Sequence, residues 1–249
     1  ECSSAGSAFS KPIVSTYSLI YTTMSGGIGA YMGGVLSNSG DIHFVPCQAS
    51  VGQKISPNGV VSTYSLIYTT NAAYAGGVLD MNGNIHFIPY FATVGQKISA
   101  SGVVSTYSLI YTTAASYMGG VLSSSGEIHF IPYQASVGQK ISSTGVVSTY
   151  SLLYTTTNAY CGGVLAKNGY IYFIPYNSEI GQRISPSGVV STYSLAYTTT
   201  GSYMGGVLSS DGNIYCIPCN AQIGQRISAY GNVSTYSLQL YEQSYAERR

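Results

Sequence analysis

The chain has 249 residues, of which 45% are hydrophobic, and its net charge is +1. Only 7% of the residues are charged, against about 25% in a typical globular protein. The balanced charge removes any electrostatic argument for nucleic acid or an acidic membrane as a partner, and no apolar run approaches the ~20 residues of a membrane span.

An internal repeat determines which elements we expect. The string Val-Ser-Thr-Tyr-Ser-Leu begins at Val14, Val61, Val104, Val147, Val190 and Val233. The first spacing is 47 residues and the others are 43, because a glycine-rich segment, residues 24–30, lengthens the first unit. Gly-Gly-Val-Leu and Gly-Gln-Lys/Arg-Ile each recur five times at the same period. Self-similarity at this period is typical of proteins built from stacked supersecondary units.

Each unit predicts four strands, which the second unit illustrates. Its first strand, residues 74–79, ends in a tight turn, Asp80-Met-Asn-Gly83. The second strand, residues 84–88, stops at a proline, which cannot donate a ladder hydrogen bond. The third and fourth strands cover residues 94–99 and 103–112 and are separated by a second glycine turn. No helical period competes with this pattern.

Four strands, two hairpins and a 43-residue period predict an all-β fold, a five-bladed β-propeller with four antiparallel strands per blade. We expect one domain over residues 1–249, with blades at approximately residues 31–70, 74–113, 117–156, 160–199 and 203–241. Apolar residues crowd the strands without clean alternation, which indicates that both faces of each sheet are buried. The blades are therefore expected to stack until the ring closes.

The stretch from Gly76-Gly-Val-Leu through Asn82-Gly-Asn-Ile-His-Phe-Ile-Pro89 to Gly95-Gln-Lys-Ile98 resembles propeller-type repeat arrays of uncharacterised microbial and viral proteins. The resemblance covers nearly the whole chain and implies the fold, with no particular activity. In blade count and in the near-identity of its blades, the chain is also similar to the tachylectin type of five-bladed lectin. That second resemblance is one of architecture, without a shared sugar-binding motif.

The fourth strand occurs six times, although the first three strands occur five times. Either residues 14–22 or the C-terminal copy, which begins at Val233, completes the last blade. A short turn ties the C-terminal copy to its own third strand, so we predict closure by that copy. The N-terminal copy is then a surplus strand, which is expected to lie at an outer edge or to pair with a neighbouring molecule.

The acidic residues form no recurring pair, and a catalytic site needs a specific set of groups in one place. We therefore predict no catalytic residues and no enzymatic activity. His43, His86 and His129 share one position in the repeat, where Tyr172 and Tyr215 stand in the other units. Because tyrosine replaces histidine well in packing but poorly as a zinc ligand, we predict packing there, with no metal and no cofactor.

One basic residue recurs in every unit, directly after a glutamine. The basic residues are Lys54, Lys97, Lys140, Arg183 and Arg226, and the glutamines are Gln53, Gln96, Gln139, Gln182 and Gln225. No acid recurs with them, so no built-in partner is visible. These pairs are candidate sites for an anionic or polyhydroxyl ligand; the alternative is that each stem packs and its head reaches solvent.

Tyrosine recurs at three positions of the repeat, and most of these rings are expected to pack between blades with their hydroxyls hydrogen-bonded. In one set, a single residue separates each tyrosine from the Gly-Gly step that follows it. The glycines of this step allow another group to approach the backbone closely. This set, a candidate for stacking on a sugar, consists of Tyr31, Tyr74, Tyr117, Tyr160 and Tyr203.

Near-identical blades predict a multivalent binding module, with a glycan or another repetitive ligand as its partner. The alternative is a structural protein (a fibre, coat or virion component) that self-associates through its surplus strand; a protein-interaction scaffold is a third interpretation. We expect an extracellular or virion-associated location, with neither a nucleic-acid partner nor a membrane span.

Overall fold

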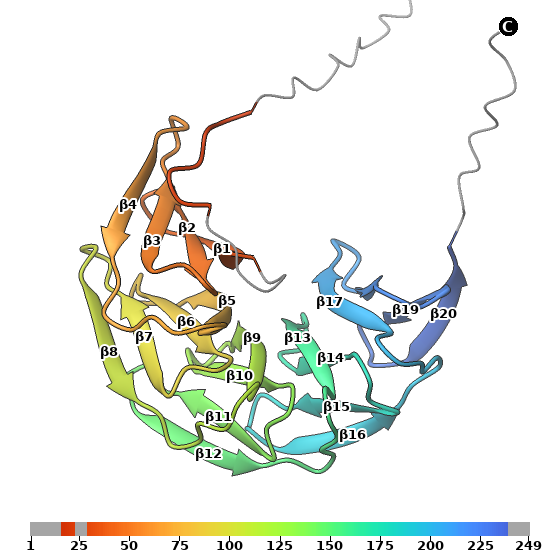
Figure 1. The fold of residues 1–249 in the computed structure, drawn as a ribbon. Helices are drawn as coiled ribbons and strands as arrows, with labels where there is room; N and C mark the ends of the chain where they lie inside the picture. Colours follow the sequence, from red (N-terminus) through yellow and green to blue (C-terminus); the bar gives the residue numbers. More distant parts are fainter. Residues whose placement is uncertain (1–15, 23–28, 239–249) are drawn as a thin grey trace, which may run out of the picture.

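A computed structural model describes residues 16–22 and 29–238 of the protein. It contains five sheets, each with four antiparallel strands in sequence order. The sheets are arranged around a common centre like the blades of a propeller (Figure 1). The predicted fold class, an all-β five-bladed propeller, is confirmed.

The strands of each blade follow one another along the chain. Blade 1 consists of β1 (Tyr31–Leu36), β2 (Ile42–Pro46), β3 (Val51–Ile55) and β4 (Val61–Ser65). Blade 2 consists of β5 (Tyr74–Leu79), β6 (Ile85–Pro89), β7 (Val94–Ile98) and β8 (Val104–Ser108). Blade 3 consists of β9 (Tyr117–Leu122), β10 (Ile128–Pro132), β11 (Val137–Ile141) and β12 (Val147–Ser151). Blade 4 consists of β13 (Tyr160–Leu165), β14 (Ile171–Pro175), β15 (Ile180–Ile184) and β16 (Val190–Ser194). Blade 5 consists of β17 (Tyr203–Leu208), β18 (Ile214–Pro218), β19 (Ile223–Ile227) and β20 (Val233–Ser237).

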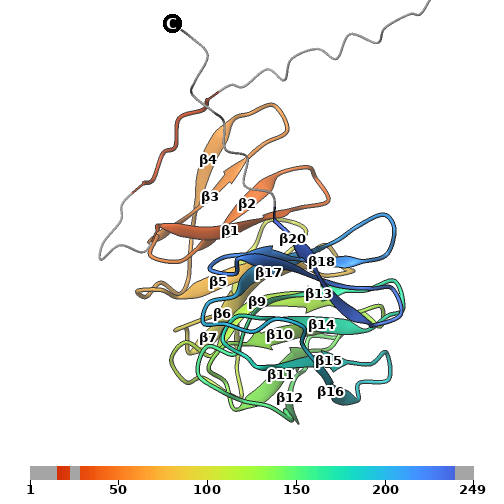
Figure 2. The same ribbon diagram turned by 90° about the vertical axis from the view of Figure 1, so that its right-hand side faces the viewer.

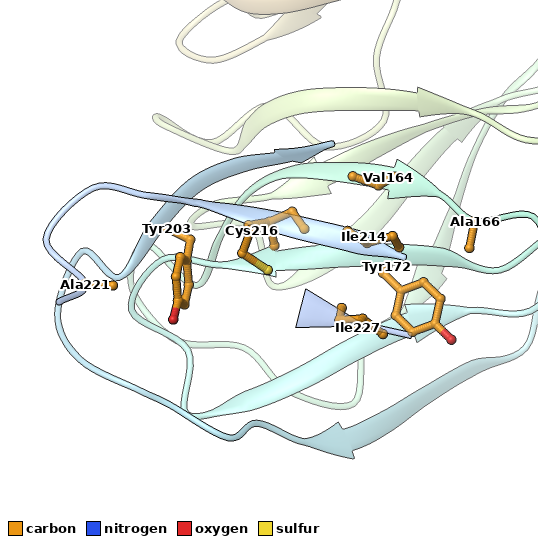
Figure 3. Packing of buried hydrophobic residues seen from close by; sticks show 9 residues of the cluster. Val164, Ala166, Tyr172, Tyr203, Ile214, Cys216, Ala221 and Ile227 are labelled. Atoms are coloured by element: carbon orange, nitrogen blue, oxygen red, sulfur yellow. The ribbon is translucent and has the colours of Figure 1, made fainter. Parts of the chain in front are cut away.

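Neighbouring blades bury their faces against each other. Between blades 4 and 5, Val164 and Tyr172 of one sheet pack with Tyr203, Ile214 and Cys216 of the next (Figure 3). Equivalent clusters join blades 1 and 2, 2 and 3, and 3 and 4. Burial on both sheet faces explains why the strands lack a clean polar alternation.

A glycine in each inner strand lets the next blade approach closely. A Cβ atom added at Gly120 of β9 would lie 2.6 Å from Cδ1 of Ile88, which belongs to β6 in the preceding blade. The adjacent Gly119 has φ +84°, a conformation that side chains of L-residues rarely adopt. The Gly-Gly step is therefore a packing device between blades.

The ring does not close in the way the sequence predicts. The inner strands pack in the order β1, β5, β9, β13 and β17, and among the described strands β17 does not pack on β1 in the same way. Figure 1 shows blade 1 and blade 5 standing apart, and Figure 2 shows the same ribbon turned by 90°, with blade 1 at the top. Val207 on blade 5 is 57% exposed, whereas its equivalent in blade 3, Val121, is 7% exposed. Among the described residues, the five blades therefore form an open ring.

The C-terminal copy of the fourth strand is β20, which pairs with β19. Part of the N-terminal copy, residues 14 and 15, lies outside the described residues. The described part forms no strand, and the backbone N–H groups of Ile20 and Tyr21 donate to Oε1 of Gln53, at 2.9 and 3.0 Å. This copy therefore lies against blade 1 rather than completing blade 5.

No helix within the described parts of the chain has the length and hydrophobicity needed to cross a membrane.

Candidate functional site

The five glutamines are structural. Gln139 is completely buried, and its Oε1 accepts hydrogen bonds from the backbone N–H groups of Ile110 and Tyr111 in the preceding blade, both at 2.9 Å. The other glutamines are equally buried and make the same pair of bonds: Gln53, Gln96, Gln182 and Gln225. Because these side chains tie each blade to the end of the one before it, they are not accessible to an external ligand.

The tyrosines before the Gly-Gly step are also interior groups. Tyr117 has no exposed surface, and its hydroxyl donates to the carbonyl of Val137 at 3.0 Å. Tyr31, Tyr74, Tyr160 and Tyr203 make the equivalent bond to the third strand of their blade. The rings on blades 2 to 5 are completely buried and are not accessible to a sugar, whereas Tyr31 on blade 1 is partly exposed.

A second set of tyrosines departs from the expectation that every hydroxyl is hydrogen-bonded. The hydroxyls of Tyr107, Tyr150 and Tyr193 are buried with no hydrogen-bond partner in the described structure. In blade 1 the equivalent Tyr64 hydroxyl lies 3.4 Å from Nδ1 of His43. Nδ1 of His86 is similarly buried without a partner. These unpaired polar atoms lie beside the cluster described next.

The basic residues face the histidines across the second and third strands. The register places His43 opposite Lys54, His86 opposite Lys97, and His129 opposite Lys140. Tyr172 and Tyr215 take the histidine position opposite Arg183 and Arg226. Each blade therefore presents a ring and a cation side by side on the same face of its sheet.

Two of the five cations, Lys54 and Lys140, have acidic partners, contrary to the expectation from the sequence. Nζ of Lys54 lies 2.7 Å from Oδ2 of Asp41, and Nζ of Lys140 lies 2.7 Å from Oε1 of Glu127. In blade 2, Oδ2 of Asp80 lies 3.2 Å from Nε2 of His86. Asp80 belongs to a different position of the repeat, which is why comparing the units position by position does not reveal a recurring acid.

Charge pairing and burial set the protonation of these groups. The hydrogen bond from Lys54 holds the pKa of Asp41 below its ordinary value, and Lys140 does the same for Glu127. Burial lowers the pKa of His43 and His86, and it lowers the pKa of His129 from 6.5 to about 4. At neutral pH the three imidazoles are therefore uncharged beside charged acids and lysines.

The buried histidines predict that stability falls as the pH decreases from 6.5 to 4.5. In this window the unfolded chain takes up a proton on each histidine, whereas folded His129, with its pKa lowered to about 4, takes up little. Between the two pKa values, 6.5 and about 4, His129 lowers the free energy of unfolding by about 3 kcal/mol. Replacing His129 with tyrosine, which occupies this position in blades 4 and 5, is expected to flatten the pH dependence of Tm. An unchanged slope in the variant would contradict this account.

The acid, histidine and lysine of one blade face an outer turn of the next blade and enclose a cavity. Between blades 1 and 2 the cavity has a volume of about 210 Å³ and is lined by Asp41, His43, Lys54 and residues 99–102. Between blades 2 and 3 a cavity of about 100 Å³ is lined by Asp80, His86, Lys97 and residues 142–145. The repeat thus places similar polar clefts at successive junctions.

The clefts are not five equivalent sites. Between blades 4 and 5 the Arg183 guanidinium lies over the Tyr170 ring, 4.7 Å from its centre, and donates to the Tyr172 hydroxyl at 3.2 Å. A Cβ atom added at Gly231 in the facing turn would lie 2.9 Å from Nη1 of Arg183. Arg226 is exposed on the last blade. Because a cleft needs a following blade, the described structure has four such junctions rather than five.

A further recurring set of residues was not recognised from the sequence. The position directly after each strand-ending proline holds Cys47, Tyr90, Tyr133, Tyr176 and Cys219. Ring centres of Tyr90 and Tyr133, and of Tyr133 and Tyr176, are each separated by 5.9 Å. Their recurrence at one position of the repeat could have identified this set from the sequence.

Among the described residues, no three His, Cys, Asp or Glu side chains gather as a metal site requires.

Comparison with known proteins identifies similar folds. No protein-family model and no curated protein matches the sequence. Virginiamycin B lyase from Staphylococcus aureus has 18% identity and a TM-score of 0.75, over 85% of this chain and 71% of that chain. A putative gluconolactonase has 11% identity and a TM-score of 0.60, over 86% and 80% of the two chains. An auxiliary nutrient binding protein from Bacteroides ovatus has 14% identity and a TM-score of 0.59, over 84% and 58%.

These similarities correct the prediction that the chain is not an enzyme. That prediction used the lack of a recurring carboxylate pair as a reason to exclude catalysis. Solved structures with this fold include a lyase and a putative gluconolactonase, so the argument from composition does not hold. At identities below 25% the similarity establishes the fold alone, and this chain is similar in fold to propellers of varied function.

Proposed function

We propose that the protein binds small polyhydroxyl ligands, with carbohydrates as the ligand class, in the polar clefts between its first three blades. The observation that carries the proposal is the cavity of about 210 Å³ between blades 1 and 2. Its walls combine an ion pair, an imidazole and several serine hydroxyls. The site has the concave shape and converging polar groups typical of small-ligand sites.

The chemistry of the cleft favours a neutral ligand with many hydroxyls over an anion. The Lys54 ammonium carries three N–H donors, of which one points to Asp41. Because Asp41 neutralises this charge at 2.7 Å, the cleft offers donors and acceptors together rather than a net positive charge. A sugar hydroxyl both donates and accepts, so it can bond to either member of the pair. Of the two ligand classes expected from the sequence, anionic and polyhydroxyl, we therefore propose the second.

The size of the cleft limits the ligand. A volume of about 210 Å³ is below the ~300–1,000 Å³ of typical drug-sized pockets. The cleft therefore suits one sugar residue, such as a chain end or a branch. The smaller cavity between blades 2 and 3 repeats the arrangement with Asp80, His86 and Lys97. Two weak sites on one rigid body can gain avidity of ~10²–10⁴ on a repetitive target.

The nutrient-binding propeller from Bacteroides ovatus supports the proposal only in a general way, because it shows that a related architecture serves ligand binding. The particular ligand follows from the residues of this chain.

The proposal is tested with a panel of soluble mono- and oligosaccharides by calorimetry and NMR. Replacing Lys54 with methionine and Asp41 with asparagine removes the ion pair without leaving an unpaired charge. We expect the dissociation constant to rise about 10- to 100-fold, since hydrogen bonds to charged groups contribute ~1.5–3 kcal/mol. The matched control is Arg226→Met on blade 5, where no following blade forms a cleft. Equal binding by the double variant and the parent, or no binding by the parent to any sugar, would refute the proposal.

A further inference from the structure

Each internal blade junction is formed by two surfaces of fixed composition. One blade contributes a valine from its inner strand and a branched residue from its second strand. The next blade contributes a glycine against which both side chains pack. At Gly120 an added Cβ atom would lie 2.6 Å from Ile88 and 3.0 Å from Val78. At Gly206 the corresponding neighbours are Ile174 and Val164, at 2.8 and 3.2 Å.

Blade 5 carries the first of these surfaces without a described partner. We call Met204, Val207 and Ile217 the trailing face. Ile217 is 45% exposed, whereas its equivalent Ile131 is completely buried. No described atom lies within 4 Å of a Cβ atom added at Gly205, although the equivalent position at Gly119 lies 3.1 Å from the next blade. The trailing face is therefore an apolar junction surface that no described residue of another blade covers.

Blade 1 carries the second surface in the same state. We call Gly34, Leu36 and Ile42 the leading face. Ile42 is 41% exposed, whereas its equivalent Ile128 is 1% exposed. Leu36 is 60% exposed, whereas the equivalent Leu79 is partly buried against the preceding blade. At Gly34 an added Cβ atom would meet groups of its own blade, Ile42 and His43, and no described residue of another blade.

We infer that the trailing face of one copy of this chain binds the leading face of a second copy, head to tail. The two faces are the two halves of an interface that the chain forms four times internally, as Figure 3 shows for blades 4 and 5. Neither face itself contains a charged residue, so mating them buries apolar surface. Arg226, the cation of blade 5, would lie in the outer part of the junction, where Arg183 lies between blades 4 and 5.

The gap between the two faces within one molecule favours a second copy as the partner. The inner strands β1 and β17, which contribute to the two faces, border the opening in Figure 1, and closing it would require the packed junctions between the blades to change. A second copy can present the trailing face at the junction angle that the internal blades already have. Such a contact is heterologous and produces a closed ring or an open filament of chains, depending on its rotation.

The N-terminal copy already occupies the outer position that the end of a preceding blade takes at an internal junction. At an internal junction, Gln96 accepts hydrogen bonds from the N–H groups of Ile67 and Tyr68, at the end of the blade before it. At blade 1 the equivalent Gln53 accepts them from Ile20 and Tyr21 of the N-terminal copy. The outer part of the junction is thus supplied by the chain itself, and the inner part, the leading face, is left for the partner.

The test measures mass by analytical ultracentrifugation over a range of protein concentrations. The parent chain is expected to assemble with increasing concentration. Val207→Asp on the trailing face and Ile42→Asp on the leading face should each weaken association by about 100-fold or more, because an unpaired carboxylate would be buried. Leu36→Asp serves as a second leading-face variant if Ile42→Asp folds poorly. Val146→Asp, at a valine that is 63% exposed on an outer turn, is the matched control and should assemble like the parent.

Mixing the two variants gives the sharpest result. Val207→Asp retains an intact leading face and Ile42→Asp retains an intact trailing face, so a 1:1 mixture should form dimers and no larger species. A parent chain that stays monomeric at all concentrations would overturn the inference. So would single-face variants that assemble like the parent, or a mixture that forms no dimer.

Discussion

Replacing Gln139 with leucine is expected to lower the free energy of unfolding by about 2–4 kcal/mol, because it leaves two partly buried backbone N–H groups without their acceptor. Oε1 of Gln139 accepts from Ile110 and Tyr111, and the side chain has no exposed surface. Leucine has a similar volume, so the cavity contribution is small. The loss therefore reports the hydrogen bonds between blades 2 and 3.

The measurement is urea and thermal unfolding of the parent and the variant. For a chain of this size the expected loss corresponds to a decrease in Tm of roughly 6–12 °C. Gln53→Leu is the matched control, because Gln53 makes the same two bonds but to the N-terminal copy, at Ile20 and Tyr21, rather than to a complete blade. A smaller loss is expected there. An equal loss at both positions would show that the junction contributes nothing beyond the local bonds.

The second large effect is expected at Gly138. A Cβ atom at this position would lie 2.1 Å from Cε2 of Tyr150, its cross-strand partner. The tyrosine ring covers the glycine backbone, and its hydroxyl is buried, so the ring has little room to move. Gly138→Ala should therefore destabilise the protein by about 3 kcal/mol through overpacking.

Gly145→Ala separates this steric effect from backbone strain. Gly145 has φ +87°, and no described atom lies within 4 Å of an added Cβ atom. Alanine there should lose only about 1 kcal/mol, from the left-handed backbone conformation. Unfolding curves of the two variants, recorded under the same conditions, provide the comparison. A greater loss at Gly145 than at Gly138 would contradict the packing argument.

The sequence was informative where the physical cause is local. The turn at Gly83 requires a positive φ at the glycine, here +81°, and the Asn82-Gly83 pair predicts it. Pro89 ends β6 because proline cannot extend a ladder. The same local signals recur in all five units of the repeat. The four strands of each blade, and hence the propeller class, follow from them.

The candidate site was only partly predictable, because adjacent residues in a strand point to opposite faces. Gln139 and Lys140 are neighbours in sequence, yet one is completely buried and the other pairs with Glu127 in a cleft. The partners of Gln139 lie 28 and 29 residues earlier in the chain. No pattern within one unit specifies which face meets the neighbouring blade.

The sequence by itself determined the blade: its four strands, its turns and the glycines that let a neighbour approach. Only the tertiary structure decided the buried role of the glutamines, the pairing of Lys54 and Lys140 with acids, and the opening between blade 1 and blade 5. Strand and turn formation depends on the residues of one unit and their immediate neighbours. How one blade is oriented on the next depends on many side-chain contacts at each junction. Whether five blades complete a circle is therefore a property of the assembled molecule.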